Sequence, residues 1–169
     1  MSNDTSVGDL SAFIVETRLA GVEVLHRCRF MGIRAIENGL IRFTNVQLGA
    51  DSLIGGEGNG LKLALATLND GRLSIPAIAA AAGEELSDFS ARWAKTRSQW
   101  GKKIGLHENG SDKLARIASG SYAMRALSNY CAALSDAGDK DMRMEAAAAK
   151  MFNTELLWTV TDIGLQLRG

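Results

Sequence analysis

The sequence predicts a mostly α-helical protein, in which a partial antiparallel β segment precedes an up-down-up bundle of three long helices. Before residue 61 the apolar residues recur with a period of two, which is typical of strands, and after it they recur at helical spacing. Glycine-containing connections separate the helical stretches, as expected for a bundle. The 169 residues, 46% of them hydrophobic, are enough for one domain and part of another, and we expect one domain over residues 1–56 and a second over 57–169.

The first part of the chain is expected to form three short strands, over Ala12–Val15, Gly21–Leu25 and Leu40–Val46. In the third of these segments, strand-forming residues alternate between two faces. The preceding run Glu37-Asn38-Gly39 is a turn signal.

A glycine-rich segment over Leu53–Gly60 follows, with glycines at 55, 56, 58 and 60. It has two interpretations, a phosphate-binding loop or a flexible joint between a sheet and a helix. No Gly-Lys-Ser/Thr ending follows and no parallel βαβ pattern surrounds it, so we favour the joint.

The helical part is expected to begin with Leu61–Leu68, where leucines and alanines share one face, and to be interrupted at residues 69–71. Asp70 or Ser74 would then cap a new helix. This start would place the only proline, Pro76, near the first turn, where its missing N–H costs least.

Three long helices complete the predicted bundle. The first is expected to end near Arg97, and residues 101–110, with three glycines, connect it to a second helix over Ser111–Ala137. A third helix is expected over Met142–Leu167, and no strand is expected between Ser74 and Leu167.

Composition excludes several classes of function. Nineteen Lys and Arg residues balance nineteen Asp and Glu residues, so there is no basic excess for nucleic acid or for an anionic membrane surface. No apolar run is long enough to span a bilayer. Cys28 and Cys131 fit no metal spacing and are interpreted as free thiols, and His26 and His107 are the only histidines, so no metal site is expected.

The N-terminal segment Met1–Leu10 is polar and lacks the patterns of a signal or transit peptide. We therefore expect a cytoplasmic protein, or one of the mitochondrial matrix if the parent is eukaryotic.

Four segments of the chain stand in a distinctive order and spacing: residues 31–60, Leu68–Leu73, Thr96–Gly101 and Gln166–Gly169. Together they resemble the acyl-CoA dehydrogenase family, from the end of its middle β-domain through most of its helical domain. The run Asn-Asp-Gly-Arg-Leu-Ser is most similar to the very-long-chain branch. The third segment is similar to the family's Arg-x-x-Phe-Gly signature with Trp in place of Phe, and the fourth to the start of its Gln-x-x-Gly-Gly turn.

The resemblance implies that FAD lies between the middle sheet and the bundle, with part of its site donated by a neighbouring subunit. Arg97 matches the arginine that meets the flavin pyrophosphate, for which a guanidinium offers a fixed fork of donors. The alternative for Arg97 is a solvated arginine at a helix end, and for Trp100 a place in the bundle core. The implied cofactor contacts are Arg97, Gln99, Trp100, Ile104, His107 and Gln166, with a backbone contact at Gly169.

The resemblance also bears on the substrate and on the general base. Arg72 matches an arginine that holds the CoA portion of an acyl-CoA, and a plain surface arginine is the alternative. The family places its catalytic glutamate at one of two positions, of which one follows residue 169 and the other matches Gly71. Glu84 and Glu85 lie about 20 Å further along a helix. No catalytic residue is therefore assigned, and the chain alone is not expected to dehydrogenate acyl-CoA.

The implied function is the α,β-dehydrogenation of acyl-CoA thioesters in fatty-acid β-oxidation, with electron-transfer flavoprotein as electron acceptor. The alternatives are part of an acyl-CoA oxidase or a non-catalytic helical self-association module. A homo-oligomer is expected, because an apolar stripe on the third helix would lack part of its cover. The stripe comprises Ala149, Phe152, Leu156, Val160, Ile163 and Leu167.

Overall fold

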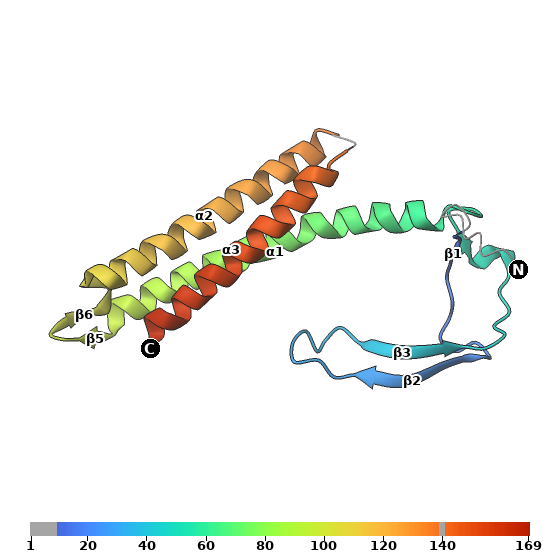
Figure 1. Cartoon of the computed structure of the whole chain (residues 1–169), viewed down its shortest axis with the longest axis horizontal. Helices are drawn as coiled ribbons and strands as arrows, with labels where there is room; N and C mark the ends of the chain where they lie inside the picture. Colours follow the sequence, from blue (N-terminus) through green and yellow to red (C-terminus); the bar gives the residue numbers. More distant parts are fainter. Residues whose placement is uncertain (1–9, 139–140) are drawn as a thin grey trace, which may run out of the picture. The chain divides into compact units, whose positions relative to one another are not determined.

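The computed structural model of the chain describes residues 10–138 and 141–169, and the prediction about Met1–Leu10 falls almost entirely outside them. Short antiparallel strands precede three long helices, which confirms the predicted fold class (Figure 1). The chain divides between Leu65 and Ala66 into two compact units. The predicted domain boundary at residues 56 and 57 stays a prediction.

The first unit is built on two small antiparallel ladders. Strand β1 (Ala12–Phe13) pairs with β4 (Leu53–Ile54), and β2 (Val22–Cys28) pairs with β3 (Asn38–Phe43). Two predictions need correction. Asn38 and Gly39 begin β3 and do not form the turn, because they pair with Cys28 and Arg27 of β2. The predicted flexible joint over Leu53–Gly60 begins too early, because Leu53 and Ile54 form strand β4 and pair with β1.

Helix α1 (Gly60–Thr96) runs through the predicted interruption without a break. The prediction of two helices is therefore wrong, and so is the placement of Pro76 in a first turn. Ser74 does not cap a new helix, since its hydroxyl donates to the carbonyl of Gly71 at 2.9 Å within α1. Pro76 is fully buried, and packing of the bundle around it offsets the backbone hydrogen bond that a proline removes.

The connection after α1 contains a hairpin, so the expectation of no strand in this region is wrong. Strand β5 (Ser98–Gln99) pairs with β6 (Lys102–Lys103), and a 3₁₀ turn, η2 (Ile104–Leu106), follows. Trp100 and Gly101 join the strands, both with positive φ, as a tight two-residue hairpin turn requires.

The two remaining helices are α2 (Glu108–Asp136) and α3 (Arg143–Arg168). Helix α2 begins three residues before the predicted Ser111, whose backbone N–H already donates to the carbonyl of His107 at 2.9 Å. Gly138, with φ of +82°, follows the C-terminal end of α2, where a left-handed residue ends a helix.

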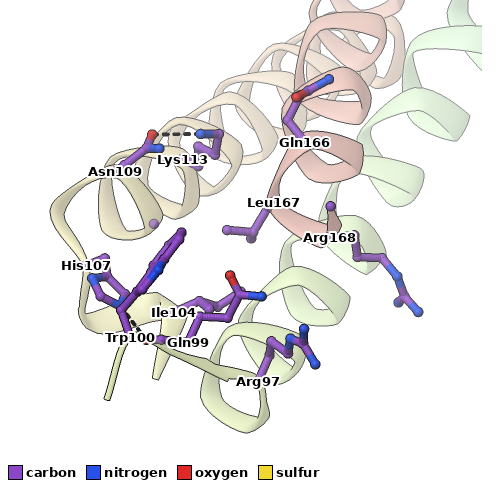
Figure 2. Close-up of a pocket in the computed structure, with 12 residues that line it drawn as sticks. Arg97, Gln99, Trp100, Ile104, His107, Asn109, Lys113, Gln166, Leu167 and Arg168 are labelled. Carbon is purple, nitrogen blue, oxygen red and sulfur yellow. Dashed lines mark hydrogen bonds between the residues drawn. The ribbon is translucent and has the colours of Figure 1, made fainter. Parts of the chain in front are cut away.

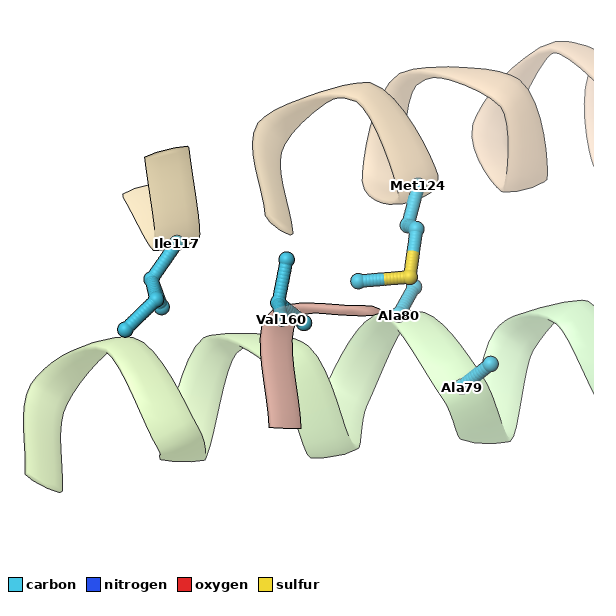
Figure 3. Close-up of a cluster of buried hydrophobic side chains, with 5 residues drawn as sticks. All are labelled: Ala79, Ala80, Ile117, Met124 and Val160. Carbon is cyan, nitrogen blue, oxygen red and sulfur yellow. The ribbon is translucent and has the colours of Figure 1, made fainter. Parts of the chain in front are cut away.

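The core of the second unit joins α1, α2 and α3. Ile117 and Met124 of α2 and Val160 of α3 are fully buried with Ala79 and Ala80 of α1 (Figure 3). The exposed stripe predicted on α3 is therefore mostly wrong. Ala149, Val160 and Leu167 are buried and Leu156 and Ile163 partly so, because the face they share is the face that packs in the bundle; Phe152 alone of the predicted stripe is exposed.

A buried amide also links the three helices. The side-chain nitrogen of Asn153 lies 3.0 Å from the carbonyl oxygens of Pro76 and Met124 and from the hydroxyl of Ser128. Both carbonyls can only accept, so this atom is the nitrogen of the amide and not its oxygen. On the surface, Arg125 of α2 makes a two-pronged ion pair with Glu84 of α1.

Candidate functional site

A pocket of about 410 Å³ opens at the end of the bundle where α1 gives way to the hairpin and α3 ends (Figure 2). All six residues predicted to contact the cofactor line it, although they are spread from position 97 to position 166. The structure thus brings together the two motifs that carried the prediction, while the role of each residue stays a prediction. The lining residues are Arg97, Gln99, Trp100, Ile104, His107, Asn109, Gly110, Lys113, Gln166, Leu167, Arg168 and Gly169.

The β5–β6 hairpin presents Arg97, Gln99 and Trp100 at this pocket. Its base is closed by a hydrogen bond of 2.9 Å from the backbone N–H of Ile104 to the carbonyl of Arg97. The ammonium of Lys103 donates to the carbonyl of Thr96 at 2.9 Å, which satisfies a free acceptor at the C-terminal end of α1. Trp100 at the tip is 86% exposed, so the alternative of a core tryptophan is wrong.

His107 stands beside the hairpin at the N-cap of α2. Its Nε2 lies 3.0 Å from the carbonyl oxygen of Gln99. A carbonyl only accepts, so Nε2 carries the hydrogen in this contact. The edge of the imidazole also meets the indole of Trp100, with ring centroids 5.9 Å apart and planes at 90°.

The pocket is cationic. Arg97, Lys113 and Arg168 line it, and among the described lining residues none is Asp or Glu. Lys113 is steadied by a hydrogen bond of 2.7 Å from its ammonium to the side-chain oxygen of Asn109, one turn earlier on α2. Such a site favours an anion that carries several acceptor oxygens.

Five lining residues were missed from the sequence: Asn109, Gly110, Lys113, Leu167 and Arg168. One signal for Asn109 and Lys113 was available in the sequence: they follow His107 closely and are one helical turn apart, so they share a face of α2. The sequence does not show, however, that this is the face that meets the hairpin. Arg168 is held by stacking, since its guanidinium carbon lies 4.7 Å from the ring centroids of both Phe89 and Trp93.

The predicted substrate residue Arg72 is not among the residues that line this pocket. It lies on α1 about 36 Å before the end of that helix. The carboxyl of Glu84, on the same helix, is engaged by Arg125, and the hydrogen bond from that guanidinium holds the pKa of Glu84 below its ordinary value.

Other kinds of site find little support in the described part of the chain. Residues 10–138 and 141–169 contain no cluster of three His, Cys, Asp or Glu side chains suited to a metal ion. None of their helices combines the length and apolar character needed to cross a bilayer. Cys28 and Cys131 are free, and burial raises the pKa of the Cys131 thiol.

Comparison with known proteins connects this geometry to a family. The C-terminal domain of acyl-CoA dehydrogenases matches residues 58–169. "Probable acyl-CoA dehydrogenase FadE10" of Mycobacterium tuberculosis is 44% identical over 162 residues, which is 96% of this chain and 25% of that protein. The very long-chain specific acyl-CoA dehydrogenase of Bos taurus mitochondria is 33% identical over 170 residues, 98% of this chain and 26% of that protein.

Solved structures agree with these matches. Butyryl-CoA dehydrogenase from Megasphaera elsdenii superposes with a TM-score of 0.91 at 28% identity, over 99% of this chain and 44% of that one. The chain spans about a quarter of the length of the sequence relatives described above. Because the domain match covers well over half of the chain, the chain belongs to the acyl-CoA dehydrogenase family, and its residues 58–169 correspond to the C-terminal domain of that family.

Proposed function

We propose that this chain supplies the helical, FAD-binding part of an acyl-CoA dehydrogenase. The observation that carries the proposal is the pocket at the end of the bundle, where residues from two separate family motifs meet and three cationic side chains, two of them from these motifs, line the wall. A cation-lined pocket without carboxylates suits the diphosphate of FAD, and its volume lies within the range of ligand sites.

Each side chain has a defined task in this proposal. The guanidinium of Arg97 binds phosphate oxygens with its fork of donors. The amides of Gln99 and Gln166 supply donors and acceptors for the rest of the dinucleotide, and Trp100 and Ile104 exclude water from it. FAD held by these residues would supply the acceptor for the hydride from the β-carbon of the acyl group. The α-proton needs a base, and we assign none to this chain because Gly71 carries no carboxylate.

The proposed partners follow from the same activity. Acyl-CoA is the substrate, with Arg72 as the contact to its CoA portion, and electron-transfer flavoprotein is the electron acceptor. A cytoplasmic location, or the mitochondrial matrix of a eukaryote, remains our expectation. We propose a dehydrogenase and not an oxidase, because the sequence relatives are named as acyl-CoA dehydrogenases.

Removing Arg97 is expected to weaken FAD binding. Arg97→Ala loses a charge-assisted hydrogen bond of about 1.5–3 kcal/mol, which corresponds to a roughly 10–150-fold increase in Kd. Binding is measured by the quenching of tryptophan fluorescence on titration with FAD. Arg92→Ala is the matched control, because Arg92 is an exposed arginine of α1 that pairs with Glu85 and does not line the pocket. Equal affinities of the two variants would refute the assignment, and a wild-type chain that takes up no FAD would refute the site.

Self-association is proposed on the outward face of α3. Four large apolar side chains are spaced by seven residues along it, and each is 63–78% exposed: Met144, Met151, Trp158 and Leu165. This exposed ridge lies opposite the buried face that contains Ala149 and Val160, so the bundle itself cannot cover it. Residues repeated every seven positions present one continuous seam to a partner helix.

Trp158→Glu is expected to weaken self-association by at least about tenfold, because a charge at the centre of an apolar contact is costly to bury. Sedimentation velocity over a concentration series measures the change. Thr159→Glu introduces the same charge at an exposed neighbour outside the ridge and should leave the association constant unchanged. If both variants associate like the wild type, the contact lies elsewhere; a wild-type chain that stays monomeric at tens of micromolar would remove the proposal.

A further inference from the structure

The tip of the β5–β6 hairpin places a bulky residue where the backbone disfavours one. Trp100 has φ of +50° and Gly101 has φ of +80°. Glycine adopts such angles without cost, but in any other L-residue the Cβ crowds the backbone, and Asn or Asp is the usual compromise. A tryptophan at this position needs other contacts to hold it.

Burial does not supply those contacts, since Trp100 is 86% exposed. The hairpin's own ladder is only two residue pairs long, Ser98 with Lys103 and Gln99 with Lys102. Two-stranded hairpins of this size are marginal in water. The tip must therefore be held from outside the hairpin.

His107 makes the two contacts that do this. Its Nε2–H donates to the carbonyl of Gln99, the residue before the tip, and its ring edge meets the indole of Trp100. His107 is itself half-buried at the start of α2, so it is anchored to the bundle. Figure 2 shows the indole extending from the hairpin into the pocket with the imidazole beside it.

We propose that His107 is a positioning residue, which fixes the carbonyl of Gln99 and the indole of Trp100 in place before the flavin binds. The inference rests on the proposed FAD site and goes beyond a direct contact between His107 and the cofactor. Holding the tip in advance lowers the cost of binding, because the hairpin does not have to be ordered at that moment. In this arrangement the hydrogen bond sets the backbone of the tip, and the ring edge sets the direction of the indole.

Three substitutions separate these contributions. His107→Leu removes both the donor and the aromatic edge. His107→Gln retains an N–H near the position of Nε2, and His107→Phe retains a ring without the donor. We expect His107→Leu to raise the Kd for FAD by roughly tenfold and His107→Gln to recover most of that loss.

A double-mutant cycle with Trp100 tests whether His107 acts through the tip. Trp100→Gly removes the indole and also the strain of a positive φ. In that background His107→Leu is expected to change the Kd less than it does in the wild type, since only the hydrogen bond to the carbonyl of Gln99 is left to lose. An equal effect of His107→Leu in both backgrounds would show that His107 does not act through the indole of Trp100 and would overturn the proposal.

A measurement without flavin keeps this inference separate from the proposed function. The chain labelled with 5-fluorotryptophan should give a ¹⁹F resonance for each of its three tryptophans, and Trp100→Phe identifies the one from the tip. His107→Leu is expected to sharpen this resonance and move it towards the solvent-exposed value, while that of the half-buried Trp93 stays in place and reports an intact bundle. An unchanged Trp100 resonance overturns the proposal even if FAD binds. If FAD does not bind but the resonance shifts, the hairpin is held by His107 and the proposed cofactor is wrong.

Discussion

Asn153→Asp is expected to lower the free energy of unfolding of the bundle by roughly 3–5 kcal/mol at neutral pH. The wild-type amide nitrogen donates to the carbonyls of Pro76 and Met124 in a site where Asn153 is fully buried. The new carboxylate would face these two oxygens with no hydrogen to give. The hydroxyl of Ser128 could turn towards it, but only by giving up its own bond of 2.9 Å to the carbonyl of Met124.

The pH dependence of this effect has a defined sign. Burial beside two carbonyls should raise the pKa of the new carboxyl in the folded state above the value of about 3.9 for a free aspartate. The folded variant then holds more protons than the unfolded chain, so its stability falls as the pH rises above about 4. The pKa of Asp141, which is lowered to about 2 by its hydrogen bonds from Arg143, acts in the opposite direction in both proteins and cancels in their difference.

Urea unfolding followed by circular dichroism at several pH values measures the difference. Asn129→Asp is the matched control, because Asn129 lies on α2 next to Ser128 but is exposed. It makes the same chemical change and should alter the stability by less than about 0.5 kcal/mol. An Asn153→Asp variant as stable as this control would show that the buried amide does not donate to the two carbonyls.

Gly110→Ala is the second large expected effect, and it acts on both the fold and the pocket. A Cβ at Gly110 would lie 2.0 Å from the carbonyl oxygen of Ile104 and 3.0 Å from its carbonyl carbon. These are backbone atoms, so no side chain can rotate to relieve the contact. Residues 104–107 would have to move away from α2, and we expect a loss of about 1–3 kcal/mol or more.

The same displacement should reduce FAD binding, since Ile104 and His107 line the pocket. Gly71→Ala is the control for the helical preference of alanine, because its Cβ would meet nothing within 4 Å in α1. That variant should gain about 0.5–1 kcal/mol. Thermal unfolding and FAD titration of both variants provide the comparison, and a Gly110→Ala protein that gains stability like Gly71→Ala would contradict the close approach of η2 to α2.

Local patterns in the chain were sufficient for the class of the fold and for most of its elements. Apolar residues that alternate with a period of two predicted β2 and β3. Apolar residues at helical spacing predicted the three long helices, and the majority of the predicted helix ends lie within a few residues of the observed ones. These patterns are local because a strand or a helix face repeats over a few residues. The resemblance at residues 96–101 and 166–169 likewise singled out four side chains that line one pocket, and Ile104 and His107, just after the first motif, line it too.

Contacts between segments that are distant in the sequence decided the features of the fold and of the pocket that local patterns did not predict. Read locally, residues 69–71 favour a break and Pro76 favours a new first turn. Helix α1 nevertheless continues, because Pro76 is packed inside the bundle and its carbonyl receives a hydrogen bond from Asn153, 77 residues later. Helical periodicity defines the faces of α3 but not which of them the bundle covers, so the apolar stripe containing Val160 became core while the ridge with Trp158 stayed exposed. Lys113 and Arg168 join the pocket for the same reason, since their places depend on how the helix ends meet in space.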